Sequence, residues 1–416
     1  MKKEIIIIDS ICGSGKTQYA IQMMNEIENR DKKYIYITPF LDEVKRIKKN
    51  TNRHFYEPDY QMGKGKKYNH FRDLILDGKN IVSTHSLFIN ITSDILELIT
   101  YNNYTLILDE VINVIENRHV TENDWEILTN NFIHIEEHTN KVVWDVTEYS
   151  GKFDEIKQLA QGNNLYLHTR SKKTDKGKTL LVWTFPIEVF KAFSEVFNLT
   201  YMFDAQLQKY YFDMYNQKYV YMSVRITDNK YELCDYIKSD LTKYKNLINI
   251  YDGENLNTIG NEYSSLSKSW FINSIKKDTI GALKNNAYNY FKNIIKSKSS
   301  YNMWTVYKKT GNTRDNIRLA ITGDGYSRGF LSCNARATNN YSHKYNCAYL
   351  LNKFMNPIDR GFFEDKGIKC NEDLYSVSEL IQWLFRSRLR KDEPINLYIP
   401  SRRMRELLIR WMNNEF

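Results

Sequence analysis

A glycine-rich stretch near the start of the chain carries residue types that bind phosphate. Residues 10–17 read SICGSGKT, so a lysine and a threonine follow two glycines. In a phosphate-binding loop, backbone N–H groups hold phosphate oxygens, the lysine reaches the β and γ phosphates, and the threonine hydroxyl binds Mg²⁺. The stretch therefore predicts a site for ATP and Mg²⁺ made by Gly13, Ser14, Gly15, Lys16 and Thr17.

Two acidic residues further along supply the carboxylates that such a site needs. Residues 105–111 read TLILDEV, an apolar run that leads into Asp109 and Glu110. A carboxylate at the end of a buried strand can hold the metal ion, and its neighbour can act as general base on water. We expect Asp109 and Thr17 to bind Mg²⁺, and Glu110 and Lys16 to act in catalysis.

The elements around the glycine stretch follow the order that phosphate binding requires. Residues 5–8 are four isoleucines, as in a buried strand, and Ala20, Met24 and Ile27 recur at helical spacing. Ser10 stands where the general pattern has its first glycine. Short apolar runs alternate with amphipathic segments in the first half, which predicts an α/β protein with a parallel sheet. The expected strands are 4–9, 34–38, 81–83, 105–109, 141–144, 179–183 and 199–203.

Composition narrows the class of protein. The chain has 416 residues, 42% of them hydrophobic, which is enough for two or three domains. The formal net charge of +9 suits a polyanionic partner. The early apolar run is too short for a signal or membrane segment, so we expect a cytoplasmic protein with no membrane partner. Five cysteines without CxxC spacing favour reduced thiols, and HIEEH (134–138) lacks a third zinc ligand.

The motifs of the first half resemble those of superfamily-two helicases of the DEAD-like group. SICGSGKT and DEV resemble motifs I and II. YITPFLDEV (36–44) resembles motif Ia and IVSTHSLF (81–88) the next box, which implies nucleic-acid contacts for Thr38, Pro39, Thr84 and His85. LTYMFD (199–204) stands at motif III, with Thr200 and Tyr201 in place of its Ser-Ala-Thr residues.

The second half carries boxes that resemble the remaining helicase motifs. NMWTVYK (302–308) follows an expected helix over 283–298 and resembles motif IV. GFLSCNARATNNY (329–341) resembles motif V, which implies nucleic-acid contacts for Arg336, Thr338 and Asn339. LIQWLFRSRLR (380–390) resembles motif VI and implies catalytic roles for Gln382, Arg386 and Arg390. On one continuous helix, Arg390 would share the face of Arg386 and Arg388 would not.

The whole pattern is similar to helicase-like ATPases of phages that infect low-GC Gram-positive bacteria. The resemblance implies two tandem RecA-like P-loop domains, 1–205 and 206–416, with parallel sheets. It implies hydrolysis of ATP to ADP and phosphate, coupled to single-stranded or forked DNA, with RNA also possible. A role in phage DNA replication or recombination, with proteins of those processes as partners and the host cytoplasm as location, would follow.

One other function fits the residues, and a third is disfavoured by them. A nucleic-acid remodelling protein with weak ATPase activity and no unwinding agrees with the altered motif III. A packaging motor would normally add a nuclease domain with clustered acidic residues, and residues 210–416 have the motif V and VI pattern instead.

Overall fold

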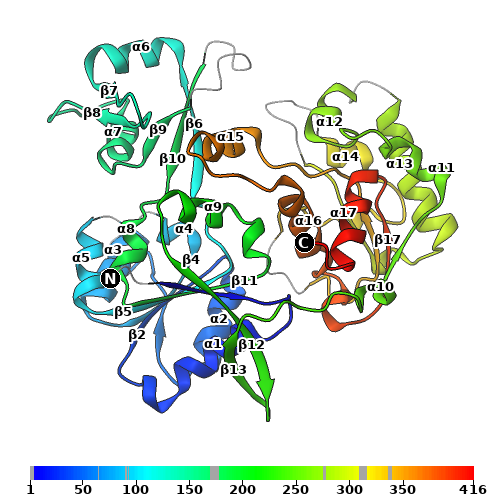
Figure 1. Cartoon of the computed structure of the whole chain (residues 1–416), viewed down its shortest axis with the longest axis horizontal. Helices are drawn as coiled ribbons and strands as arrows, with labels where there is room; N and C mark the ends of the chain where they lie inside the picture. Colours follow the sequence, from blue (N-terminus) through cyan, green and yellow to red (C-terminus); the bar gives the residue numbers. More distant parts are fainter. Residues whose placement is uncertain are drawn as a thin grey trace. The chain divides into compact units, whose positions relative to one another are not determined.

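Two compact units make up the computed structural model of the chain (Figure 1). The structure describes residues 4–63, 65–89, 91, 93–168, 178–274, 278–308, 316–335 and 340–416. Unit 1 comprises Met1–Ser10, Gly15–Ile237 and Asn356–Cys370, and unit 2 comprises Ile11–Ser14, Lys238–Met355 and Asn371–Phe416. The expected boundary between residues 205 and 206 falls inside unit 1, because the chain adds two strands to the first sheet after that point.

Among the described residues, an eight-stranded sheet forms the centre of unit 1. Its order is β13-β12-β1-β11-β5-β2-β4-β3, and neighbours are parallel except for the antiparallel pair β12 and β13. The strands are β1 (Ile5–Asp9), β2 (Lys33–Thr38), β3 (Phe55–Tyr56), β4 (Asn80–Thr84), β5 (Tyr104–Asp109), β11 (Glu195–Thr200), β12 (Tyr219–Thr227) and β13 (Lys230–Asp235). The α/β class and four of the expected strands, β1, β2, β4 and β5, are confirmed.

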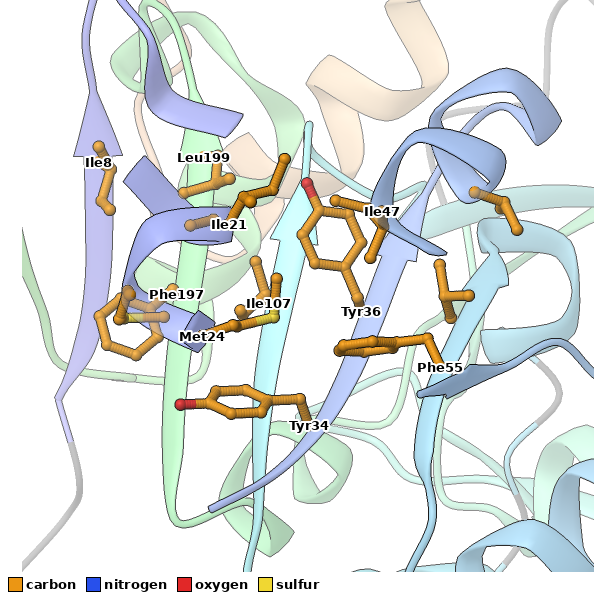
Figure 2. Packing of buried hydrophobic residues seen from close by; sticks show 14 residues of the cluster. Ile8, Ile21, Met24, Tyr34, Tyr36, Ile47, Phe55, Ile107, Phe197 and Leu199 are labelled. Carbon is orange, nitrogen blue, oxygen red and sulfur yellow. The ribbon is translucent and has the colours of Figure 1, made fainter. Parts of the chain in front are cut away.

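Helices connect these strands and bury the apolar side chains of the sheet. Ile21 and Met24 of α1 and Ile47 of α2 pack against Tyr36 and Ile107 of the central strands (Figure 2). A parallel sheet needs such a cover because its strands are apolar on both faces. The helices of this part are α1 (Lys16–Asn25), α2 (Leu41–Asn50), α3 (Lys67–Leu76), α4 (His85–Phe88), α5 (Ser93–Tyr101), α8 (Glu188–Ala192) and α9 (Leu207–Met214).

Between β5 and β11 the chain forms a separate small α+β segment. It contains a three-stranded antiparallel sheet of order β6-β10-β9 and a hairpin of β7 and β8. The elements are β6 (Ile115–Thr121), α6 (Glu122–Asn131), β7 (Ile133–Ile135), β8 (Val142–Trp144), α7 (Asp154–Gln161), β9 (Leu165–Leu167) and β10 (Lys178–Thr184). We call residues 115–184 the inserted segment.

The inserted segment corrects part of the sequence prediction. Residues 141–144 and 179–183 do form strands, but β8 and β10 pair antiparallel in the small sheets and not in the parallel sheet. A short apolar run predicts a strand without specifying its partner, and here the partners lie close in sequence. The strand expected at 199–203 is β11, which begins at Glu195 and ends at Thr200.

A later helix, α15 (Pro357–Asp365), belongs to unit 1 and packs on the inserted segment. The ring of Phe362 lies 5.5 Å from that of Tyr166, measured between centroids. Asn117 of β6 donates a 2.7 Å hydrogen bond to Asp359. Asn356–Cys370 therefore belong to unit 1, although the chain before and after them belongs to unit 2. Within these fifteen residues, α15 packs against a segment more than 170 positions earlier in the sequence.

Unit 2 is built on a second parallel sheet. Its four strands have the order β14-β17-β16-β15 in the described part of the chain. They are β14 (Ile248–Ile250), β15 (Asn302–Thr305), β16 (Asn346–Tyr349) and β17 (Ile395–Tyr398). The helices are α10 (Tyr244–Leu247), α11 (Glu254–Asn257), α12 (Lys268–Ser274), α13 (Thr279–Asn289), α14 (Ile317–Ile321), α16 (Glu372–Leu384) and α17 (Arg402–Met412).

Two expected elements of unit 2 differ in extent from the structure. The strand at the motif IV box ends at Thr305, and α13 is continued by a π-helical turn, Tyr290–Ile294. The single helix expected over residues 380–390 is wrong, since α16 ends at Leu384 and a 3₁₀ turn, Arg388–Lys391, follows. No helix in the described parts of the chain has the length and apolar character needed to span a bilayer.

Candidate active site

The loop after β1 depends on glycine at two positions. Gly13 and Gly15 both have φ of +92°, in the left-handed region that side chains with a Cβ rarely adopt. Gly15 caps the N-terminus of α1, where free backbone N–H groups favour an anion. The Lys16 amine folds back over the loop and donates to the Ser10 carbonyl at 2.5 Å. The loop therefore has the backbone and the cation that a phosphate group needs.

Ser10, which replaces the first glycine of the general pattern, has a structural function. Its hydroxyl accepts a 3.3 Å hydrogen bond from the backbone N–H of Val224 in β12. Its own N–H donates to the carbonyl of Thr200 at 3.2 Å. Ser10 thus joins the start of the loop to both strands that flank β1.

Asp109 lies at the carboxyl end of β5 and faces Thr17. The Thr17 hydroxyl is 3.3 Å from Oδ2 and 3.5 Å from Oδ1 of Asp109, and the Tyr36 hydroxyl donates to Oδ2 at 2.9 Å. Burial, together with the negative charges of Glu110 and Glu43, raises the pKa of Asp109 to about 7. A hydroxyl beside a crowded, half-buried carboxylate is a donor set that suits a hard divalent cation such as Mg²⁺.

Glu110 follows Asp109 in a backbone conformation that is rare for its type. Its φ is +77°, and its N–H donates to the Leu199 carbonyl at 2.9 Å. A left-handed non-glycine residue costs of order 1–3 kcal/mol and persists only where the surroundings enforce it. Such residues are concentrated at functional sites, and this one turns the chain just beyond the carboxylate of Asp109.

The strand β11 brings these groups together. The register of the sheet pairs Asp9 with Thr200 and Leu199 with Asp109, so the ends of β1, β11 and β5 are adjacent. The Thr200 hydroxyl is buried and has no hydrogen-bond partner among the described residues. Thr200, at the position predicted for motif III, therefore presents a polar group between the glycine loop and the acidic pair. Ligands of open α/β sheets bind at this edge.

The comparisons with known proteins place the chain in a family. A model of the YonV C-terminal Rossmann-like domain matches residues 242–412, and a model of the YonV middle domain matches residues 115–183. The SPbeta prophage-derived protein YonV of Bacillus subtilis (strain 168) is 41% identical, over 99% of this chain and 100% of that protein. The chain belongs to the YonV family.

The fold of this YonV-family chain is helicase-like. A solved structure of an XPD helicase matches with a TM-score of 0.50 at 11% identity, over 99% of this chain and 94% of that one. The helicase MrfA, solved with DNA and AMPPNP, matches with a TM-score of 0.34 at 10% identity, over 99% of this chain and 48% of that one. The first match shows a full-length likeness to a two-domain helicase core, which confirms the expected architecture.

The YonV middle domain corresponds to the inserted segment, which lies in the sequence between the neighbouring strands β5 and β11 of the sheet of unit 1. The sequence prediction missed it as a separate body. Its signal was a spacing of more than eighty residues between the end of β5 and the start of β11, longer than the connections between the other consecutive strands of this sheet.

The motif VI residues lie in the YonV C-terminal domain. Gln382 is buried in α16, and Arg386 is 6% exposed just after the helix end. The Nε and Nη2 atoms of Arg386 have no hydrogen-bond partner within the described residues. Arg390 lies in the 3₁₀ turn, so the helical argument that put it on the face of Arg386 no longer applies.

Arg388 of the same YonV domain has a structural environment. Its Nε donates to the Pro394 carbonyl at 2.6 Å, and its guanidinium lies 4.2 Å from the centre of the Tyr345 ring. Its backbone N–H donates to the Lys344 carbonyl. These contacts hold the segment after α16 against the second sheet.

Four of the seven predicted nucleic-acid contacts are described, and they form two pairs in sequence. Thr38 and Thr84 end the neighbouring strands β2 and β4 and are directly opposite in register. Pro39 and His85 follow them, and His85 begins α4. The structure therefore gathers both boxes at one edge of the sheet. Arg336, Thr338 and Asn339 lie outside the described residues.

Two residues that the sequence prediction did not select also belong to this site. Tyr36 is fully buried in β2 and reaches Asp109 through its hydroxyl. The Asp9 carboxylate accepts 2.9 Å hydrogen bonds from the backbone N–H groups of Met202 and Phe203. Asp9 gave a signal, since an acidic residue ends an isoleucine run, whereas nothing in the sequence set Tyr36 apart from other core tyrosines.

Proposed function

We propose that this chain is a nucleic-acid-dependent ATPase, and that it acts as a DNA helicase or translocase in phage DNA replication or recombination. The observation that carries the proposal is the register of β1, β11 and β5. It brings the phosphate loop, Thr200 and the acidic pair to one edge of the sheet. The helicase-like fold and the prophage origin of the relative support the same function.

The residues of unit 1 take the following parts in this reaction. Backbone N–H groups of Gly13, Ser14 and Gly15 and the Lys16 amine hold the phosphates of ATP. Thr17 and Asp109 hold Mg²⁺, which supplies positive charge to the phosphate oxygens when bound. Glu110 accepts a proton from the attacking water.

The residues of unit 2 supply the charge that the transition state requires. Arg386 is the arginine that stabilises the transferring phosphoryl group, with Gln382 and Arg390 as its neighbours in the motif. The support is its burial without a partner for Nε and Nη2, because an isolated buried guanidinium is costly unless it meets an anion.

The nucleic-acid partner binds through its backbone. Thr38, Pro39, Thr84 and His85 contact sugar and phosphate on unit 1, and Arg336, Thr338 and Asn339 do so on unit 2. Such contacts carry no sequence information, which suits a protein that must move along any strand. The formal charge of +9 favours association with this polyanion.

The test is ATP turnover by the wild type and by Lys16→Ala, each with and without single-stranded DNA. We expect turnover that DNA stimulates in the wild type and none in the variant, since Lys16 contributes charge to phosphate and nothing to the core. Lys45→Ala, on the exposed side of α2, is the matched control and should behave as the wild type. Equal turnover by Lys16→Ala and the wild type would refute the site.

A second function is favoured by one observation. Motif III reads Thr200 and Tyr201 in place of Ser-Ala-Thr, and this motif couples hydrolysis to unwinding in the helicases that the sequence resembles. The chain would then be a nucleic-acid-binding remodelling protein with weak ATPase activity.

A further inference from the structure

The hairpin of β12 and β13 reaches the phosphate loop through one aromatic ring. A Cβ atom placed on Gly15 would lie 2.1 Å from Cε1 and 2.7 Å from Cδ1 of Tyr231. The ring of Tyr231 therefore lies directly on the backbone of Gly15, at the N-terminus of α1. Gly15 has two reasons to lack a side chain, its φ of +92° and this ring.

The backbone of Tyr231 is anchored to the same helix. The Gln22 side chain donates from Nε2 to the Tyr231 carbonyl at 2.9 Å, and its Oε1 accepts from the Tyr231 N–H at 2.9 Å. The side-chain amide of Gln22 thus binds both backbone polar groups of Tyr231, which is 209 positions later in the sequence. These two hydrogen bonds hold the backbone from which the Tyr231 ring projects. Figure 1 shows β13 beside α1.

The register of the hairpin shows what else lies on this face. Val224 is opposite Leu233 and Ile226 is opposite Tyr231, and directly opposed residues of an antiparallel pair share a face. Val224 and Leu233 pack against the core that α1 covers. Ile226 continues this apolar face but is 60% exposed. Tyr231 and Ile226 therefore form an apolar surface next to the phosphate loop, part of which faces solvent.

We propose that Tyr231, with Ile226 beside it, is the platform on which the base of the bound nucleotide stacks. The inference rests on the proposed function, because it takes the loop of Gly13 to Thr17 as the phosphate site. Once the phosphates are held there, the ribose and base extend away from the loop, and a planar base gains most from an aromatic ring. The Gln22 anchor makes the ring a preorganised part of the site.

The experiment compares two ligands that differ in the base. Equilibrium dissociation constants for ATP and for inorganic tripolyphosphate are measured with the full-length wild type, Tyr231→Ala and Tyr231→Trp. We expect Tyr231→Ala to weaken ATP binding roughly tenfold and to leave tripolyphosphate binding unchanged. Tyr231→Trp should retain ATP affinity, because stacking needs a ring and no hydroxyl.

A matched control lies on the other face of the hairpin. Tyr236 is 48% exposed, and its ring lies 5.5 Å from that of Tyr221, so Tyr236→Ala should bind both ligands as the wild type does. The proposal is overturned if Tyr231→Ala binds ATP normally, or if it loses both ligands equally, which would make Tyr231 a support of the loop. If the wild type binds ATP but does not hydrolyse it, the ATPase function is refuted. The affinities for ATP and tripolyphosphate then still decide whether the base stacks on Tyr231.

Discussion

At the scale of single residues, the acidic pair at the end of β5 has two proposed tasks, metal binding by Asp109 and action on water by Glu110. Asp109 points to Thr17 and Tyr36, inside the sheet edge, while Glu110 leaves the strand with φ of +77°. The two neighbours therefore differ in backbone conformation, although their carboxylates remain close enough for the charge of Glu110 to raise the pKa of Asp109.

This division predicts the behaviour of Glu110→Gln. The variant should bind ATP and Mg²⁺ as the wild type does, because Lys16, Thr17 and Asp109 are unchanged. Hydrolysis should fall by about 10² or more, the range that general bases contribute. Nucleotide binding and single-turnover hydrolysis separate the two effects, with Glu97→Gln on the exposed side of α5 as control. Normal turnover in Glu110→Gln would assign the base to another residue.

At the scale of elements, the end of α16 determines what the motif VI arginines can do. The helix ends at Leu384, so Arg386 lies in the following turn and Arg390 in a 3₁₀ turn. The sequence prediction assumed a continuous helix, and nothing in LIQWLFRSRLR signals the break. Ser387 caps the 3₁₀ turn by accepting from the N–H of Leu389, an interaction that depends on the local backbone.

Replacing each arginine tests the role of this segment. Arg386→Ala should leave ATP binding nearly intact and lower hydrolysis by about 10³, as for other arginines that act on the transferring phosphoryl group. Arg390→Ala should have a smaller effect. Arg388→Ala should lower the free energy of unfolding and affect turnover least, because it removes the contacts with Tyr345 and Pro394. Full turnover in Arg386→Ala would contradict the assignment.

The helix α15 gives a pH dependence that can be measured. Burial raises the pKa of Asp359 above its ordinary value of 3.8, and the hydrogen bond from Asn117 only partly opposes this. Between the unfolded and folded pKa values, the folded state binds more protons than the unfolded state. The free energy of unfolding due to Asp359 should therefore fall as the pH rises through this window.

Urea unfolding between about pH 4 and pH 7 checks the effect. Asp359→Asn should lose this part of the pH dependence and gain stability over the wild type at the upper end of the range. Asp365→Asn, on the exposed side of the same helix, should keep the dependence of the wild type. Parallel curves for the wild type and Asp359→Asn would show that Asp359 is not perturbed.

At the scale of the whole molecule, two parallel sheets are joined with an inserted segment that belongs to neither. The likeness to a solved helicase structure extends over 99% of the chain, at 11% identity. The proposed motor function requires that hydrolysis change the grip on nucleic acid, so binding and turnover alone do not establish it.

Strand displacement distinguishes the two proposed functions. A translocating helicase should separate a duplex with a single-stranded tail when ATP is present, and Lys16→Ala should not. A remodelling protein should bind the same substrate and hydrolyse ATP slowly without separating it. The wild type, Lys16→Ala and Glu110→Gln are compared on one substrate at fixed salt, since binding to phosphate weakens as salt rises.

The α/β class and the strands β1 and β5, with the glycine stretch and the acidic pair that follow them, could be predicted from local sequence. Each is a local pattern: glycines that permit left-handed backbone, a lysine and threonine next to them, and apolar runs that end in a carboxylate. The remaining features depend on tertiary contacts. Whether a run such as 141–144 joins the large sheet, where α16 ends, and which ring rests on Gly15 depend on partners distant in sequence. Neither Gln22 nor Tyr231 has a local pattern that reveals the other, because their contact forms only when the hairpin closes on α1.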